Sequence, residues 1–229
     1  MANQEFMNFL SHFYFDRNTE NHNQVLGIVL PDLLKNANKT WTIHPEKNEE
    51  EYTGLNLISL YTGWKRHILV DKYFHCSIFF LEHSRTIRTE IFPFLVNSPV
   101  KPFFVAHIAL ELMLDSLLLK ENLITASRFY WHLEQINKTA LSNFLEINKI
   151  DDPERFIRFL NKFIASGYLE SYRDANQIVN AINGICTRLW IKPFDEEQKI
   201  RLTKVIVNYM IDLRKEFMII FDEIEKKLS

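Results

Sequence analysis

The chain has 229 residues, of which 47% are apolar, so it can bury a substantial core and is not a disordered protein. Glycine and proline together make up about 5% of the chain, against roughly 12% in average proteins. This scarcity of turn-forming residues disfavours an all-β sandwich or barrel and favours long helices. The net charge of −2 argues against a general nucleic-acid-binding protein, so any basic site must be local.

Cysteine usage and the first residues of the chain bear on its cellular setting. Cys76 and Cys186 lie far apart and lack the spacing of a zinc cluster or of a disulfide framework. The first residues lack the basic start and continuous apolar core of a signal peptide, and charges or histidines interrupt each long apolar stretch before about 18 residues. We therefore expect a cytoplasmic protein, with neither a membrane nor a nucleic acid among its partners.

Apolar residues recur at helical spacing along most of the chain, which predicts a single all-α domain over residues 1–229. The polar stretch 36–53 is expected to be a loop or the entry to a helix. One long or kinked helix is expected to begin at residue 55 and to end at Pro93, Pro99 and Pro102. A helix should begin at the Asp-Asp-Pro-Glu signal of 151–154 and end at Gly167. The expected helices, about eight, cover 3–15, 25–34, 55–92, 103–119, 124–148, 153–167, 174–189 and 196–228.

The last expected helix, 196–228, has charged residues on one face and apolar residues on the other. The apolar face can pack against its own domain or against a second copy in a homodimer, and the pattern fits either arrangement.

Two segments place histidines and carboxylates four residues apart. His67, Asp71 and His75 fall within about 80° of one another on a helical wheel, so all three project from one face. Histidine and carboxylate side chains on adjacent helical turns are a common way to present metal ligands. This spacing is also frequent in helices that bind no metal.

The second segment repeats this geometry with His107, Glu111 and Asp115, within an apolar stripe. Buried carboxylates need a cation, a hydrogen-bonding partner or a raised pKa, because desolvating an unpaired charge costs several kcal/mol. We therefore predict a metal site between the two helices, with nitrogen and oxygen ligands that suit Mn, Fe, Mg or Zn. The alternative is a set of histidine–carboxylate hydrogen bonds in the core.

Other histidines and one aspartate carry weaker signals. His12, Asp32 and His132 each stand alone in the pattern, and His22 and His44 lie in polar segments where exposure is expected.

Five segments, taken in order, carry a resemblance to a known family. They are 7–12 (MNFLSH), 27–32 (GIVLPD), 67–75 (HILVDKYFH), 106–107 (AH) and 172–174 (YRD), the last followed by Gly184 and Arg188. Together they resemble the acyl carrier protein phosphodiesterases over roughly residues 7–190, with insertions near 36–55. The order and spacing of the segments are a stronger signal than any one of them.

This resemblance implies an all-helical fold distantly related to the HD-type metal phosphohydrolases. It implies a reaction that removes the 4′-phosphopantetheine arm from the serine of acyl carrier protein, with manganese or magnesium as cofactor. By the same resemblance, Asp32, His67, Asp71 and His107 lie nearest the metal and the phosphodiester. His12 lies beside them, and either His12 or His107 carries the proton, so that His12, Asp32 and His107 are the expected catalytic residues.

The chain departs from the family pattern at four positions: Ile28, Ile68, His75 and Ala106. His75 and Glu111 can replace lost carboxylate ligands, which gives a histidine-rich site that favours iron, zinc or nickel. The resulting metal-ligand set is Asp32, His67, Asp71, His75, His107 and Glu111. The alternative function is a non-catalytic helical binding protein that keeps the same scaffold. A helical module that binds an apolar ligand, suggested by the nineteen phenylalanines, is a weaker alternative.

Acyl carrier protein is acidic, so the resemblance also implies a basic rim beside the site. Candidates are the adjacent Lys65 and Arg66, and the pair Arg85 and Arg88. Each pair also fits an ordinary solvated helix face, which would steer association more than it would fix affinity.

Overall fold

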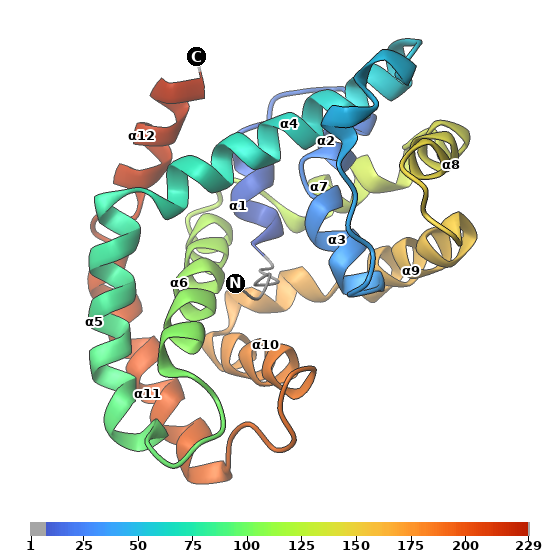
Figure 1. Ribbon diagram of the computed structural model, residues 1–229. Helices are drawn as coiled ribbons and strands as arrows, with labels where there is room; N and C mark the ends of the chain where they lie inside the picture. Colours follow the sequence, from blue (N-terminus) through green and yellow to red (C-terminus); the bar gives the residue numbers. More distant parts are fainter. Residues whose placement is uncertain (1–7, 229) are drawn as a thin grey trace. The chain divides into compact units, whose positions relative to one another are not determined.

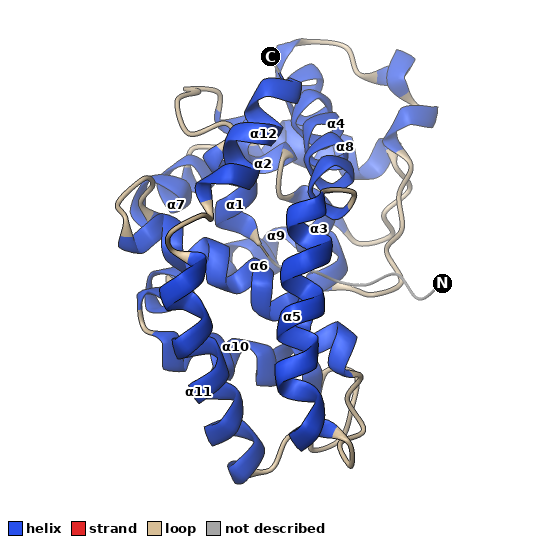
Figure 2. Cartoon of the chain, turned by 90° about the vertical axis from the view of Figure 1, so that its left-hand side faces the viewer, coloured by secondary structure: helices blue, strands red, loops and turns tan. Residues whose placement is uncertain are grey.

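The computed structural model describes residues 8–228, and within that range it is all-helical, with 75% helix and no strand (Figure 2). Twelve α-helices and three short 3₁₀ helices are found in these residues. The all-α prediction is confirmed, while the number of helices exceeds the expected eight. The HD-like arrangement stays a prediction.

Contacts between residues divide the chain into two compact units. The first unit consists of Met1–Asp71 and Ile124–Leu169, and the second of Lys72–Leu123 and Glu170–Ser229. The single domain over 1–229 stays a prediction.

The first unit is built around buried aromatic side chains. Its helices are α1 (Phe9–Tyr14), α2 (His22–Gly27), α3 (Leu30–Ala37), α4 (Leu55–His75, up to Asp71), α7 (Ala126–Glu134), α8 (Lys138–Ile147) and α9 (Pro153–Ser166) (Figure 1). The 3₁₀ helices η1 (Pro45–Lys47) and η2 (Glu49–Glu51) lie in the stretch expected to be a loop. Helix α2 packs against α7, and α9 packs against α3 and α8. The rings of Phe13 and Phe129 lie 5.4 Å apart between α1 and α7, which places α1 in the core.

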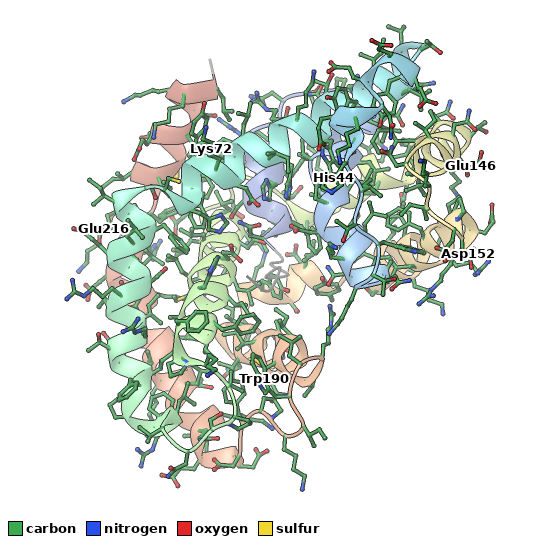
Figure 3. All side chains as sticks on the ribbon, in the orientation of Figure 1. His44, Lys72, Glu146, Asp152, Trp190 and Glu216 are labelled. Atoms are coloured by element: carbon green, nitrogen blue, oxygen red, sulfur yellow. The ribbon has the colours of Figure 1, made fainter. Side chains whose placement is uncertain are left out.

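Capping residues mark where helices of this unit begin and end. The Asp152 side chain (Figure 3) accepts a hydrogen bond from the Arg155 amide at 2.8 Å, and Gly167 ends α9 with a φ of 58°, so both predicted ends of this helix are confirmed. The single helix expected over 124–148 is wrong, because the Asn137 side chain accepts from the Ala140 amide and starts a new helix, α8. Of the helix expected over 3–15, residues 3–7 lie outside the described part of the chain.

The second unit is centred on α6 (Pro102–Lys120), which packs against the helices around it (Figure 1). These are α5 (Ile78–Leu95), α10 (Ala175–Thr187) and α11 (Glu196–Leu213). Helix α12 (Met218–Leu228) follows α11, and η3 (Tyr168–Arg173) precedes α10. Among the described helices, α6 is long and apolar enough to cross a membrane by length and composition alone. The core helix of a globular protein passes the same test, and 89% of the most apolar 18-residue window of α6 is buried inside the protein.

Other expected helices are divided too, and the one expected over 25–34 breaks between Gly27 and Leu30 into α2 and α3. The helix expected over 55–92 breaks at Cys76 and Ser77, because the Ser77 hydroxyl accepts from the Phe80 amide at 3.0 Å and donates to the Phe74 carbonyl at 2.6 Å. Pro93 lies inside α5 and does not end it, although a proline lacks the N–H that would continue the helical hydrogen bonds, and α5 runs only two residues further, to Leu95. The helix expected over 196–228 divides between Leu213 and Met218 into α11 and α12.

Helices α2 and α4 meet at two glycines. A Cβ atom on Gly63 would lie 2.8 Å from the Gly27 Cα and 2.8 Å from the Ile28 nitrogen, and one on Gly27 would lie 2.9 Å from the Gly63 Cα. Real Cβ atoms do not come this close to backbone atoms, so the crossing requires glycine on both helices. Gly63 is therefore a packing residue in the middle of α4, and it brings the backbone at Ile28 against the turn of α4 that carries His67.

Candidate metal centres

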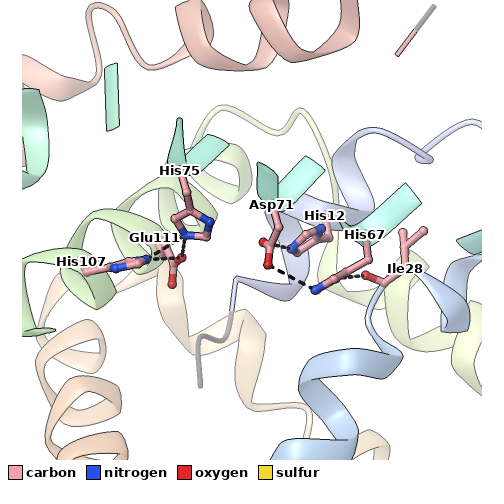
Figure 4. A network of polar contacts seen from close by, with 7 residues as sticks. All are labelled: His12, Ile28, His67, Asp71, His75, His107 and Glu111. Carbon is pink, nitrogen blue, oxygen red and sulfur yellow. Dashed lines mark hydrogen bonds and ion pairs between the residues drawn. The ribbon is translucent and has the colours of Figure 1, made fainter. Parts of the chain in front are cut away.

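Four predicted site residues converge in the first unit: His12 on α1, Asp32 on α3, and His67 and Asp71 on α4. Ligand atoms of His12, Asp32 and His67 all lie within 4.8 Å of one another. Asp71 joins them through contacts of Oδ1 with His12 Nε2 at 3.3 Å and of Oδ2 with His67 Nε2 at 3.6 Å (Figure 4). We call these four residues the first group.

The backbone fixes the tautomer of His67. Its Nδ1 lies 2.8 Å from the carbonyl oxygen of Ile28 (Figure 4), and a carbonyl oxygen can only accept a hydrogen bond. Nδ1 therefore carries the hydrogen, and in the neutral ring Nε2 keeps its lone pair, directed at Asp71. A histidine that donates its other nitrogen to a carbonyl is typical of metal ligands. The side chain that replaces the family residue at position 28 takes no part in this contact.

Burial is uneven across the first group. His12 and His67 are buried, and their rings stack at 4.0 Å with an angle of 17°. Asp32 is half-buried, and the side chain of Asp71 is 38% exposed. The two histidines are therefore the buried part of the group, and the two carboxylates are the part that solvent reaches.

An ion pair beside the group ties α1 to α4. The Arg66 guanidinium donates to the buried Asp16 carboxylate at 2.7 Å and to the Phe15 carbonyl at 3.1 Å. Gln24 on α2 donates to the other Asp16 oxygen at 2.7 Å. Lys65 is paired with Glu49 at 3.3 Å, so both cations expected to form a basic rim next to His67 have partners within the first unit.

The second unit holds another group, made of His75 at the end of α4 and of His107 and Glu111 on α6. The Nε2 atoms of the two histidines are 2.9 Å apart, and Glu111 Oε1 lies 3.0 Å from His107 Nε2 and 3.3 Å from His75 Nε2 (Figure 4). We call these three residues the second group. Like the first, it could hold a metal ion.

Glu111 is a buried anion in this group, with an exposed fraction of 1%. Burial by itself would raise the pKa of the Glu111 carboxyl, but its interactions with His107 and His75 outweigh burial and lower the pKa. The carboxylate is therefore ionised at neutral pH and acts only as an acceptor. Its second oxygen, Oε2, is buried without a hydrogen-bond partner among the described residues.

The structure does not group the predicted ligands as the helical wheel does. His67 and Asp71 contact each other, whereas His75 meets residues of α6 in the second unit. Asp115 is fully buried but belongs to neither group of converging ligand atoms. His12 and Asp32, which carried weak signals as single residues, belong to the first group. Metal binding by these residues and their part in catalysis stay predictions.

A histidine pair with no counterpart in the sequence pattern lies elsewhere in the first unit. His132 on α7 is fully buried, and its Nδ1 lies 3.0 Å from Nδ1 of the half-buried His22. His44 is exposed, as expected (Figure 3). Burial, reinforced by the neighbouring His22, lowers the pKa of His132 to about 4. Sequence offers no signal for this pair, because the two residues are far apart in the chain.

This lowered pKa predicts a loss of stability in mild acid. The unfolded chain binds the proton near the ordinary pKa of about 6.5 and the folded chain only near 4, so the free energy of unfolding falls as pH decreases through that window. Between pH 7.5 and pH 5 this residue should account for a loss of about 2 kcal/mol. Urea unfolding of His132→Leu at both pH values should show a fall smaller by that amount, while removal of the exposed His44 serves as the control. An equal fall in wild type and His132→Leu would contradict the assignment.

No protein-family model, curated protein or solved structure matches the chain. The fold and the two groups therefore define a class only: an all-helical protein with a histidine–carboxylate group in each of its two units. The similarity to acyl carrier protein phosphodiesterases stays a prediction from the ordered sequence segments.

Proposed function

We propose that the protein is a metal-dependent phosphodiester hydrolase whose active site is the first group. The observation that carries this proposal is the contact of His67 Nδ1 with the Ile28 carbonyl, which leaves Nε2 as a lone-pair donor facing Asp71. When the His67 ring is neutral, the lone pair of Nε2 faces the Asp71 carboxylate, and a cation between the two turns this repulsive contact into an attractive one.

The donor set suits a divalent cation. Asp32, His67 and Asp71 offer two carboxylates and one imidazole, and the imidazole of His12 lies next to them. Such mixed oxygen and nitrogen donors fit manganese, iron or zinc, and magnesium is the other cofactor implied by the family resemblance. The half-exposed carboxylates leave one side of the site open to a substrate.

Each residue of the first group has its own role in the proposed reaction. The chemistry supplied by a bound cation is polarisation of a phosphoryl oxygen and acidification of water. His67 is held in one orientation by the Ile28 carbonyl, and Asp71 by the two histidines that it faces. His12 is the proposed proton carrier, because its Nε2 lies 3.3 Å from Asp71, which provides a counter-ion for the protonated ring. His107, the other candidate for this role, lies in the second group.

The substrate proposed for this site is the phosphodiester that joins 4′-phosphopantetheine to acyl carrier protein. This choice is supported by the sequence segments that resemble the phosphodiesterase family, three of which carry the four residues of the first group. The proposal treats acyl carrier protein as the partner. Of the two basic pairs considered for contact with the acidic surface of this partner, Arg85 and Arg88 are exposed on α5.

The test uses the full chain, stripped of metal and resupplied in turn with manganese, magnesium, iron and zinc. We expect hydrolysis of bis(p-nitrophenyl) phosphate and conversion of holo to apo acyl carrier protein, measured by mass spectrometry, with both activities abolished by EDTA. Metal binding by the first group without turnover of either phosphodiester would instead support the non-catalytic binding protein. Absence of both metal binding and turnover would overturn the proposal.

A further inference from the structure

We propose that the second group, His75, His107 and Glu111, is a separate binding site for a divalent transition metal such as zinc. This site goes beyond the proposed hydrolase, because all three ligands belong to the second unit and none belongs to the first group. Its chemistry differs too, with two imidazoles and one carboxylate.

The spacing of the three atoms matches a single ion. Nitrogen and oxygen ligands that lie about 2.0–2.1 Å from zinc are separated from one another by about 2.9–3.4 Å in octahedral or tetrahedral geometry. The three observed separations are 2.9, 3.0 and 3.3 Å. One ion can therefore contact His75 Nε2, His107 Nε2 and Glu111 Oε1 with little movement of the side chains.

Hydrogen bonds alone cannot make all three contacts in the triangle formed by His75 Nε2, His107 Nε2 and Glu111 Oε1 favourable. Glu111 Oε1 lies 3.0 Å from His107 Nε2 and 3.3 Å from His75 Nε2, and a carboxylate oxygen only accepts, so at least one imidazole must donate to it. If one Nε2 carries a hydrogen, the lone pair of the other nitrogen faces the carboxylate. If both carry one, the two hydrogens meet between nitrogens only 2.9 Å apart. A cation in the triangle turns all three close contacts into favourable ones.

Burial of the carboxylate points to the same conclusion. Glu111 is 1% exposed, and its Oε2 has no hydrogen-bond partner in the described part of the chain. A buried carboxylate with one unsatisfied oxygen costs free energy, and coordination of a cation by Glu111 offsets that cost.

The second group has an aromatic neighbour, and one of its three side chains is partly exposed. The ring of Phe80 lies 5.0 Å from the His75 ring and 4.7 Å from the His107 ring, both edge to face, and forms an apolar wall. The Ser77 cap holds the turn that joins His75 to this wall. The His75 side chain is 26% exposed, which leaves a path for an ion and for further ligands. Two imidazoles and one carboxylate favour zinc, cobalt, nickel or iron over magnesium and calcium, which prefer oxygen ligands.

The experiment measures metal binding in a variant that lacks the first group. The full chain with His67→Gln and Asp71→Asn is stripped of metal and titrated with Zn²⁺, Co²⁺ and Mg²⁺. We expect one equivalent of Zn²⁺ by calorimetry, a visible Co²⁺ absorption band that Zn²⁺ displaces, and no binding of Mg²⁺. Adding His75→Ala should weaken Zn²⁺ binding by more than about 100-fold, beyond the loss typical of outer-shell partners.

Controls separate loss of the site from loss of the fold. His75 is partly exposed, so His75→Ala should keep the far-ultraviolet circular dichroism of the parent, and His44→Ala removes an exposed histidine outside both groups. Unchanged Zn²⁺ binding in the His75→Ala variant, or no Zn²⁺ binding in its folded parent, would overturn the proposal. Failure of the hydrolase proposal would show as absent turnover with this Zn²⁺ site intact.

Discussion

Replacing His67 with glutamine should lower kcat/KM for phosphodiester hydrolysis by at least about 1,000-fold, which corresponds to about 4 kcal/mol of transition-state stabilisation. Glutamine is of similar size, so the buried position stays filled. Its amide group can still donate to the Ile28 carbonyl, but it offers a metal a weakly basic amide oxygen in place of the imidazole nitrogen. The effect should appear with manganese and with acyl carrier protein or a small phosphodiester alike.

The neighbouring position provides the control. Ile68 is 49% exposed on the same helical turn, so Ile68→Ala should keep near wild-type activity and stability. The measurements are steady-state kinetics, metal content by mass spectrometry and thermal unfolding of each variant. A loss of less than about tenfold in a folded His67→Gln protein would show that this histidine is a core residue and not a metal ligand.

Helical content follows from the sequence, while several helix ends do not. The Asp152 cap and Gly167 could be recognised because each signal lies at the edge of an apolar pattern. Ser77 and Asn137 lie inside continuous patterns, where the same residue types also occur within helices. Their capping role depends on the direction in which the next helix leaves, and tertiary packing decides that direction.

Periodicity identified the four-residue spacings within α4 and α6 but could not pair them. A wheel shows that His67, Asp71 and His75 share a face, yet that face is long enough to meet different partners along its length. His12 and Asp32 were found through the resemblance alone, since single residues on separate short helices have no spacing to detect. The glycines carry a further signal: in a chain with only five of them, Gly27 and Gly63 both fall within helical patterns. A glycine in a helix interior costs about 1 kcal/mol, so it indicates close packing.

Gly63→Ala tests whether this glycine crossing positions the site. Alanine normally stabilises a helix interior by about 1 kcal/mol relative to glycine. Here the added methyl would meet the Gly27 Cα and the Ile28 nitrogen at 2.8 Å, and backbone atoms cannot move aside as side chains do. We expect a net loss of about 2 kcal/mol in the free energy of unfolding, within the range of overpacked cores. Urea unfolding with a single probe in each unit measures it.

Gly184→Ala is the matched control, because Gly184 lies inside α10 and a methyl group there meets nothing within 4 Å. That substitution should stabilise the protein by about 0.5–1 kcal/mol, so the two glycines should give effects of opposite sign. If helix α2 is pushed away from α4, the Ile28 carbonyl also moves away from His67. Gly63→Ala should then weaken manganese binding at the first group, although residue 63 touches no ligand, and leave Zn²⁺ binding at the second group unchanged. Equal stabilisation by both alanines would show that the crossing of α2 and α4 accommodates the added methyl group without strain. The proposed link between helix packing and the orientation of His67 would then be wrong.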